Sequence, residues 1–465
     1  MSSIDAESMH RLAKMALDAG EVATPEEALE LFTHYRLRLH LGDDWADTMA
    51  GQSCFLTSLN TSVRAFLGGV EVYGDLSRIL DVPLYQGREA RAVCEELGGM
   101  VSSEATTELP TLVIGAAPAM PSSSFCVRMS WNYWQAAIAP MTDFSLICEN
   151  DNPLAGVAAA ALGVSEAFHY VRGDLPDAGH RTVGLSLWNP LAIAEWREEV
   201  HKGPALQYLP KALYLVGLGH LGQAYAWSVS MLPYPADGRP HLVLQDVDKA
   251  AKSNLSTCML LSSADVGKRK VRCVAQRLEA AGFSTDLVER RFGPHHKLAV
   301  DEPTTALFGV DNVAARRDLD SAGFALVVEA GLGSGFSDFR NIRTHTFPGP
   351  RAPSEIWPAE AGVQTAIVLN DTYRKLAEKH DDLCGMTQLA SRAVATPFVG
   401  ALAAALVLSE VIRPLHGGPV HPTVDLQMKN LRFRTGSAPT KYFGQPAPFV
   451  QATSLIPAVT KGEKK

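Results

Sequence analysis

The sequence predicts a mixed α/β fold built on a Rossmann-like, doubly wound and mostly parallel sheet, and three observations predict it. Short apolar runs at 111–115 and 212–217 are bounded by turn residues, as buried strands are. After residue 212, strand-like and helix-like segments alternate, which is typical of a parallel sheet covered by helices. Two Ala-rich segments, at 153–166 and 397–410, have the composition of buried helices.

Length and composition predict a folded chain of more than one domain. The chain has 465 residues, of which 46% are hydrophobic and 20% charged, with a formal net charge of −8. At about 150 residues per domain, this length predicts two or three domains. A mildly acidic chain lacks a general basic field for nucleic acid, so we expect no nucleic-acid partner.

The apolar runs and the cysteines indicate in which cellular compartment we expect the protein. The runs around 154–164 and 398–408 are shorter than the roughly 18 residues of a spanning helix, so we expect no membrane insertion. The seven cysteines are scattered and include no C-x-x-C pair, which is typical of a protein in a reducing compartment. The N-terminus carries acidic residues where a secretory signal would be basic and then apolar. We therefore expect a cytoplasmic protein without structural zinc.

Composition divides the chain into two regions. Residues 1–50 are charged and predicted to be helical, with a helix opening at Pro25, and short strands are predicted at 111–115 and 144–148. The segment 174–203 is richer in Gly, Pro and charged residues, so a boundary is expected there. The expected domains are an α/β region over 1–200 and a second domain over 204–465.

An internal similarity connects these two regions. Residues 153–166 align without gaps on residues 397–410. One interpretation is that Ala-rich helices resemble each other through composition alone. The other is a duplicated fold whose first copy is degenerate, since the turn after the strand at 111–115 has no glycine fingerprint.

A glycine-rich turn is the strongest local signal for a binding site. Gly217, Gly219 and Gly222 follow an apolar strand and open an apolar helix, where glycines let phosphate approach the backbone N–H groups. Asp246 follows the next strand and is well placed for ribose hydroxyls. Up to this point a nicotinamide-dependent oxidoreductase explains the pattern equally well.

Further motifs then appear in a fixed order: Asp246-Val-Asp248, Asn254-Leu255, Val266-Gly-Lys-Arg-Lys270 and Asp311-Asn312. Their order and spacing over 212–333 resemble the ThiF/MoeB family, which includes the ubiquitin-activating enzymes. The resemblance implies an adenylyltransferase that uses ATP and Mg²⁺. It also implies roles for these residues: Asp246 and Asp248 in the nucleotide site with Asp246 on the ribose, Asn254 and Lys270 on the phosphates, and Asp311 as the metal ligand.

Two departures from the family pattern leave the activity open. Thr257 stands where the family usually carries a phosphate-facing arginine, and His220 stands where it usually carries a glycine. The leading hypothesis is adenylation of a protein or peptide C-terminal carboxylate. The alternative is a catalytically silent nucleotide-binding scaffold that presents a substrate to a partner enzyme.

The resemblance also bears on the partners. Cys384 is the candidate nucleophile for a thioester, although Asp381 and Asp382 would raise the pKa of its thiol, and an incidental cysteine is the alternative. The expected partners are a ubiquitin-like protein or peptide and a conjugating enzyme. The active form in this family is normally a dimer, so we expect a homodimer or an internal pseudo-dimer in which the N-terminal region is an inactive half.

Overall fold

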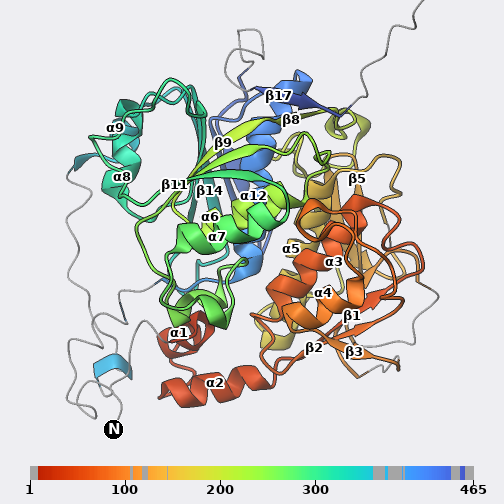
Figure 1. Ribbon diagram of the computed structural model, residues 1–465. Coiled ribbons are helices and arrows are strands. Elements are labelled where there is room, and N and C mark those ends of the chain that lie inside the picture. The colour runs from red at the N-terminus through yellow and green to blue at the C-terminus, as the bar shows by residue number, and fades with distance from the viewer. Residues whose placement is uncertain are drawn as a thin grey trace, which may run out of the picture.

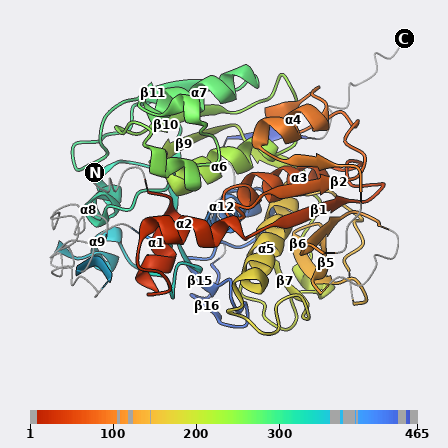
Figure 2. The ribbon, with the colours of Figure 1, turned by 90° about the horizontal axis from the view of Figure 1, so that it is seen from below.

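The computed structural model describes residues 9–104, 108–117, 124–143, 145–359, 372–374, 390, 393–440 and 451–455. Two large sheets dominate these residues, one in each half of the chain. The two sheets with their covering helices, orange to yellow in the N-terminal half and green to blue in the C-terminal half, lie side by side in both views, and the red N-terminal segment lies beneath the C-terminal half in Figure 1 (Figure 1, Figure 2). The α/β fold class is confirmed.

The first sheet has seven strands in the order β3-β2-β1-β4-β5-β6-β7. Strands β3, β2, β1, β4 and β5 are parallel, whereas β6 and β7 are antiparallel additions. The strands are β1 (Leu37–Leu41), β2 (Val70–Tyr73), β3 (Met100–Ser102), β4 (Thr111–Ile114), β5 (Cys126–Asn132), β6 (Gln135–Pro140) and β7 (Val183–Ser186).

The second sheet repeats this topology. Its order is β11-β10-β9-β12-β13-β14-β15-β16, with the first five strands parallel and the last three antiparallel. The strands are β9 (Ala212–Val216), β10 (His241–Gln245), β11 (Ser284–Val288), β12 (Thr305–Phe308), β13 (Leu326–Leu332), β14 (Asn341–Phe347), β15 (Thr423–Gln427) and β16 (Arg434–Gly436). A small third sheet pairs β8 (Tyr208–Pro210) with β17 (Ala452–Ser454).

The helices follow the same repeat. In each half one helix follows the central strand, one precedes the first edge strand, and a long apolar helix connects the first two antiparallel strands. These are α3 (Met49–Ser62), α4 (Ala90–Leu97) and α5 (Pro153–Arg172) in the first half, and α6 (His220–Met231), α7 (Lys270–Ala280) and α12 (Pro397–Ile412) in the second. The remaining described α-helices are α1 (Arg11–Asp18), α2 (Pro25–Thr33), α8 (Val313–Arg317) and α9 (Pro353–Ile356).

Four of these helices, α3, α5, α6 and α12, pack on one another between the halves. The aligned glycines of α5 and α12 occupy equivalent places: a Cβ on Gly156 would lie 2.1 Å from the Ala50 carbonyl oxygen of α3, and a Cβ on Gly400 would lie 2.4 Å from the His220 ring of α6. Both helices therefore need glycine where they cross the start of a neighbouring helix. The matching topology and contacts favour duplication over chance composition.

The helices α5 and α12 are longer than their apolar runs indicated. By length and hydropathy, 153–172 and 397–416 could each cross a membrane, so the length argument made from the sequence was wrong. In the structure 89% and 94% of the 18-residue apolar windows within these two segments are buried inside the protein, as in core helices. Asn152 caps α5 at its start, and Gly173 ends the helix in the left-handed conformation at φ 71°.

Two local predictions differ from the structure. Residues 37–41, predicted to be helical, form the central strand β1, in which Arg38 is fully buried and paired with Glu71 at 2.6 Å. The described part of the predicted strand 144–148 is not a strand, because the Leu146 N–H donates to the Ser130 side chain at 3.1 Å instead of to a neighbouring strand. The helix start at Pro25 and the strand at 111–114 are confirmed.

Candidate functional site

The glycine-rich turn joins β9 to α6 and is shaped by close packing. Gly217 has a φ of 83°, and a Cβ there would lie 2.7 Å from the Val310 side chain. A Cβ on Gly222 would lie only 1.7 Å from the Gly217 carbonyl oxygen. Gly219, at the N-cap of α6, would meet nothing within 4 Å. Two of the glycines are thus required by the fold, and the third leaves open space at the helix start.

Asp246 fastens the turn to the end of β10. Its Oδ2 accepts the Leu218 N–H at 2.6 Å, and its Oδ1 accepts the Asp248 N–H at 2.7 Å. The carboxylate therefore holds the turn and the segment after β10 in one arrangement. This fixed geometry is what a binding site at the carboxyl ends of parallel strands needs.

Lys270 brings a buried positive charge to the same place. It is the first residue of α7, its side chain is 8% exposed, and its Nζ lies 3.2 Å from Asp248 Oδ2. Burial alone would lower the pKa of Lys270, but the nearby carboxylates of Asp246 and Asp248 outweigh burial and raise it. Lys270 therefore stays protonated across the physiological pH range.

Asp311 and Asn312 follow β12 and have different tasks. Asn312 is the N-cap of α8, and its Oδ1 accepts the N–H groups of Ala314 and Ala315 at 2.9 and 3.3 Å. Asp311 is exposed, and no described residue forms an ion pair with its carboxylate. Arg316 stabilises the loop after β12, because its Nε donates a hydrogen bond to the Val310 carbonyl at 3.0 Å. The capping role thus belongs to Asn312, which leaves the Asp311 carboxylate available.

These residues line one cavity of about 220 Å³ at the carboxyl ends of β9, β10 and β12. Its walls include Gly217, Gly219, Asp246, Asp248, Lys270 and Asp311. Arg290, Arg291 and Phe292 also line it, and none of them was predicted from the sequence. They follow β11, the neighbour of β10, so an accurate strand order would have identified them.

Other predicted residues lie elsewhere. The Asn254 side chain accepts the Ala251 N–H at 2.8 Å within the short helix Lys252–Ser256 and does not belong to the described cavity wall. Thr257 is buried, and the His220 ring packs against Gly400 rather than lining the cavity. Gly222 packs against the Gly217 carbonyl and is not part of the described cavity wall. Cys384 lies outside the described residues.

The cavity offers a limited set of metal ligands. Among the residues that the structure describes, no group of three or more His, Cys, Asp and Glu side chains is arranged to hold a metal ion. Mg²⁺, however, is commonly bound through one or two carboxylates together with substrate phosphates and water. The exposed carboxylate of Asp311 fits that mode of binding.

The equivalent place in the first half is filled. The turn after β1 keeps one glycine, Gly42, but continues with Asp43 and Asp44, and the Asp44 Oδ1 accepts the Ala116 N–H at 2.5 Å across the ends of β1 and β4. The Trp45 ring is 1% exposed, and its Nε1 donates to the Asp75 carbonyl at 2.9 Å, beyond the end of β2. Side chains thus occupy the region that is open in the second half.

Together these features define a class: an α/β protein with two sheets of matching topology and one cavity built around a glycine-rich turn. Comparison with known proteins then identifies the family. Residues 36–187 match the family described as the BilD N-terminal domain, and residues 209–418 match the BilD C-terminal domain. The bacterial E1-like protein BilD of Collimonas sp. (strain OK412) is 40% identical over 444 residues, covering 94% of this chain and 95% of its own. The chain belongs to the BilD family of E1-like proteins.

Two solved structures illustrate distant likenesses. E. coli MccB with selenomethionyl MccA is 14% identical with a TM-score of 0.32, over 51% of this chain and 66% of that chain. PaaA is 16% identical with a TM-score of 0.31, over 49% of this chain and 64% of that chain. The present chain thus spans just under two thirds of each.

Proposed function

We propose that the cavity binds ATP and that the chain activates the C-terminal carboxylate of a protein or peptide by adenylation. The observation that carries this proposal is the convergence of Gly219, Lys270 and Asp311 on one cavity. In the reaction a carboxylate oxygen attacks the α-phosphorus of ATP. The bond between the α- and β-phosphates breaks, and the products are an acyl-adenylate and pyrophosphate.

The chain's own residues would align the phosphates and neutralise their charge, because both reactants are anions. The N–H groups at the start of α6, beside the open space at Gly219, would receive phosphate oxygens. The Lys270 ammonium, held at 3.2 Å from Asp248, would face the triphosphate. Mg²⁺ held by Asp311 would neutralise further phosphate charge. Arg290 and Arg291 line the cavity and would supply guanidinium groups to the phosphates, in place of the family's usual arginine at the position of Thr257.

We further propose that the N-terminal half is an inactive copy that replaces a second subunit. The filled turn around Trp45 supports this proposal, as does the packing of the halves. Trp227 Nε1 of α6 donates to Thr57 Oγ1 of α3 at 3.0 Å, and Asn60 of α3 donates to the Met259 carbonyl at 3.0 Å. Light scattering should then give the mass of a single chain, whereas the mass of two chains would favour a homodimer.

An ATP–pyrophosphate exchange assay tests the adenylation proposal, with a ubiquitin-like protein from the same source as the carboxylate donor. Lys270→Ala should abolish exchange. Lys268→Ala is the matched control, because Lys268 is exposed two residues away and lies near Asp265 at 3.8 Å, outside the cavity. Equal exchange by both variants would contradict the proposed role of Lys270.

A silent scaffold is the second candidate function. Two observations favour it. Thr257 stands where the resemblance implies a phosphate-facing arginine, and the Asn254 side chain, also expected on the phosphates, lies away from the described cavity wall. Calorimetry and mass spectrometry separate the two candidates. Retained ATP binding without an acyl-adenylate would indicate the scaffold. Transfer of the acyl group to Cys384 or to a conjugating enzyme is tested only if the adenylate forms.

A further inference from the structure

A second cavity, of about 550 Å³, lies between the last strands of the two halves. Its walls come from the residues before and after β7 and from the turn between β15 and β16. It shares no lining residue with the cavity around Lys270. A volume of this size suits a small-molecule ligand.

The walls of this cavity carry a concentrated positive charge. Four arginines line it, together with a single acidic residue: Arg181, Arg197, Arg432, Arg434 and Asp177. The formal charge of the described lining residues is therefore +3, and it falls to +2 when Glu166, which pairs with Arg181 behind the wall, is included, in a chain whose net charge is −8. A fold would not gain stability by gathering like charges in this way, so the cluster points to a binding role.

Two of these arginines lack a carboxylate partner among the described residues. Arg434 is only 5% exposed, and its guanidinium reaches two backbone carbonyls, of Ile193 at 3.2 Å and Pro190 at 3.5 Å. Its Nε has no hydrogen-bond partner there, and burial lowers its pKa to about 10. Arg432 is exposed, and no described carboxylate pairs with it.

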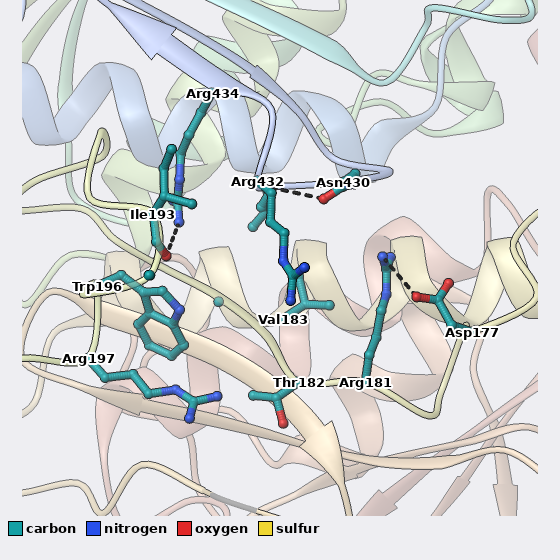
Figure 3. A pocket seen from close by; sticks show the side chains of 13 residues that line it. Asp177, Arg181, Thr182, Val183, Ile193, Trp196, Arg197, Asn430, Arg432 and Arg434 are labelled. Atoms are coloured by element: carbon teal, nitrogen blue, oxygen red, sulfur yellow. Dashed lines mark hydrogen bonds and ion pairs between the residues drawn. The ribbon is translucent and has the colours of Figure 1, made fainter.

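The other two arginines are held in place around the same space. Glu166, buried on α5, binds Arg181 Nε and Nη2, both at 2.9 Å, which fixes that guanidinium at the cavity wall. The Arg197 guanidinium lies 5.1 Å from the centre of the Trp196 ring. In Figure 3, Arg432 reaches down from the β15–β16 turn between Arg181 on one side and Arg197 and Arg434 on the other.

We propose that this cavity binds a ligand with two adjoining phosphate groups, with Arg432 and Arg197 contacting the phosphates and Arg434 supporting them from the wall. Two phosphates carry about −3 charge or more at neutral pH, which is opposite in sign to the charge of the described wall. Guanidinium groups also suit the planar, paired hydrogen bonding of phosphate oxygens. The free pyrophosphate ion and the diphosphate of a nucleotide share this chemistry. The proposal does not depend on adenylation at the other cavity.

Isothermal titration calorimetry tests this site in full-length protein that carries Lys270→Ala. Under the proposed function, this substitution should weaken phosphate binding at the other cavity. Sodium pyrophosphate and ADP are titrated separately in a phosphate-free buffer. Arg432→Glu should lower pyrophosphate affinity about tenfold or more, since a charge-assisted contact is lost and a repulsive charge is added. Arg36→Ala, which removes a surface arginine outside both cavities, should change nothing.

The outcomes separate the two sources of the phosphates. Binding of pyrophosphate but not ADP, sensitive to Arg432→Glu, identifies the free ion, whereas tighter and equally sensitive binding of ADP identifies a nucleotide. The proposal is overturned if neither probe binds at millimolar concentration, or if both bind with the same affinity after Arg432→Glu. Because Arg432 is exposed, its replacement should leave thermal unfolding unchanged, and this is checked on the same samples.

Discussion

Replacing Gly219 and Gly222 by alanine, one at a time, separates the binding role of the turn from its packing role. A Cβ at residue 219 would meet nothing within 4 Å, and the φ of −81° lies outside the left-handed region that favours glycine. We therefore expect Gly219→Ala to change the free energy of unfolding by less than about 0.5 kcal/mol. Its methyl group would instead occupy the open space where phosphate approaches the backbone. Loss of a hydrogen bond to a charged group costs about 1.5–3 kcal/mol, so ATP affinity should fall about tenfold to a hundredfold.

Gly222→Ala should behave in the opposite way. The added Cβ would lie 1.7 Å from the Gly217 carbonyl oxygen, so α6 and the turn must move apart. Overpacking of this kind costs about 1–3 kcal/mol. For a domain of this size each kcal/mol lowers the melting temperature by roughly 2–4 °C. The variant should therefore melt several degrees below the wild-type protein even without ATP.

Both variants are compared by thermal unfolding without nucleotide and by calorimetric titration of ATP with Mg²⁺. Gly293→Ala is the control, because a Cβ there also meets nothing within 4 Å and the residue lies outside the cavity wall. It should change neither stability nor affinity. The reasoning is refuted if Gly219→Ala binds ATP as tightly as the wild-type protein, or if it destabilises the fold as much as Gly222→Ala.

Three further predictions concern other parts of the molecule. Arg290→Ala should weaken ATP binding about tenfold in the same titration without lowering the melting temperature, because Arg290 is exposed at the cavity wall; unchanged affinity would exclude it from the site. Trp45→Ala should cost about 3–5 kcal/mol in urea unfolding, since the ring is 1% exposed, yet it should create no second ATP site beside Asp43 and Asp44. Burial alone would raise the pKa of Glu410, but Arg413 and His421 together outweigh burial and lower it. The stabilisation from this carboxylate is therefore present above its unfolded pKa, near 4.3, and is lost as the pH falls through the lower folded pKa. Melting curves of wild type and Glu410→Gln between pH 3 and 7 should converge toward the acidic end, and a constant gap would contradict this.

The site could be predicted from the sequence as far as its determinants are local. The β9 strand, the turn at Gly217–Gly222 and the place of Asp246 after β10 depend on short-range patterns of glycine and apolar residues, which are visible in a single sequence. The ordered spacing of the motifs added Lys270 and Asp311, and both line the cavity. Asn254 shows the limit of spacing, because its side chain forms a local bond that competes with a contact to a ligand.

Tertiary structure alone decided which residues meet from distant parts of the chain. Arg290 reaches the cavity because β11 pairs with β10, and Arg432 comes to lie beside Arg181 because the last strands of the two halves approach each other. Residues 37–41 became a central strand because neighbouring strands cover both edges and Glu71 neutralises the buried Arg38. Sequence periodicity reports which face of one element is apolar. Pairing between elements depends on long-range packing, which no short window of sequence contains.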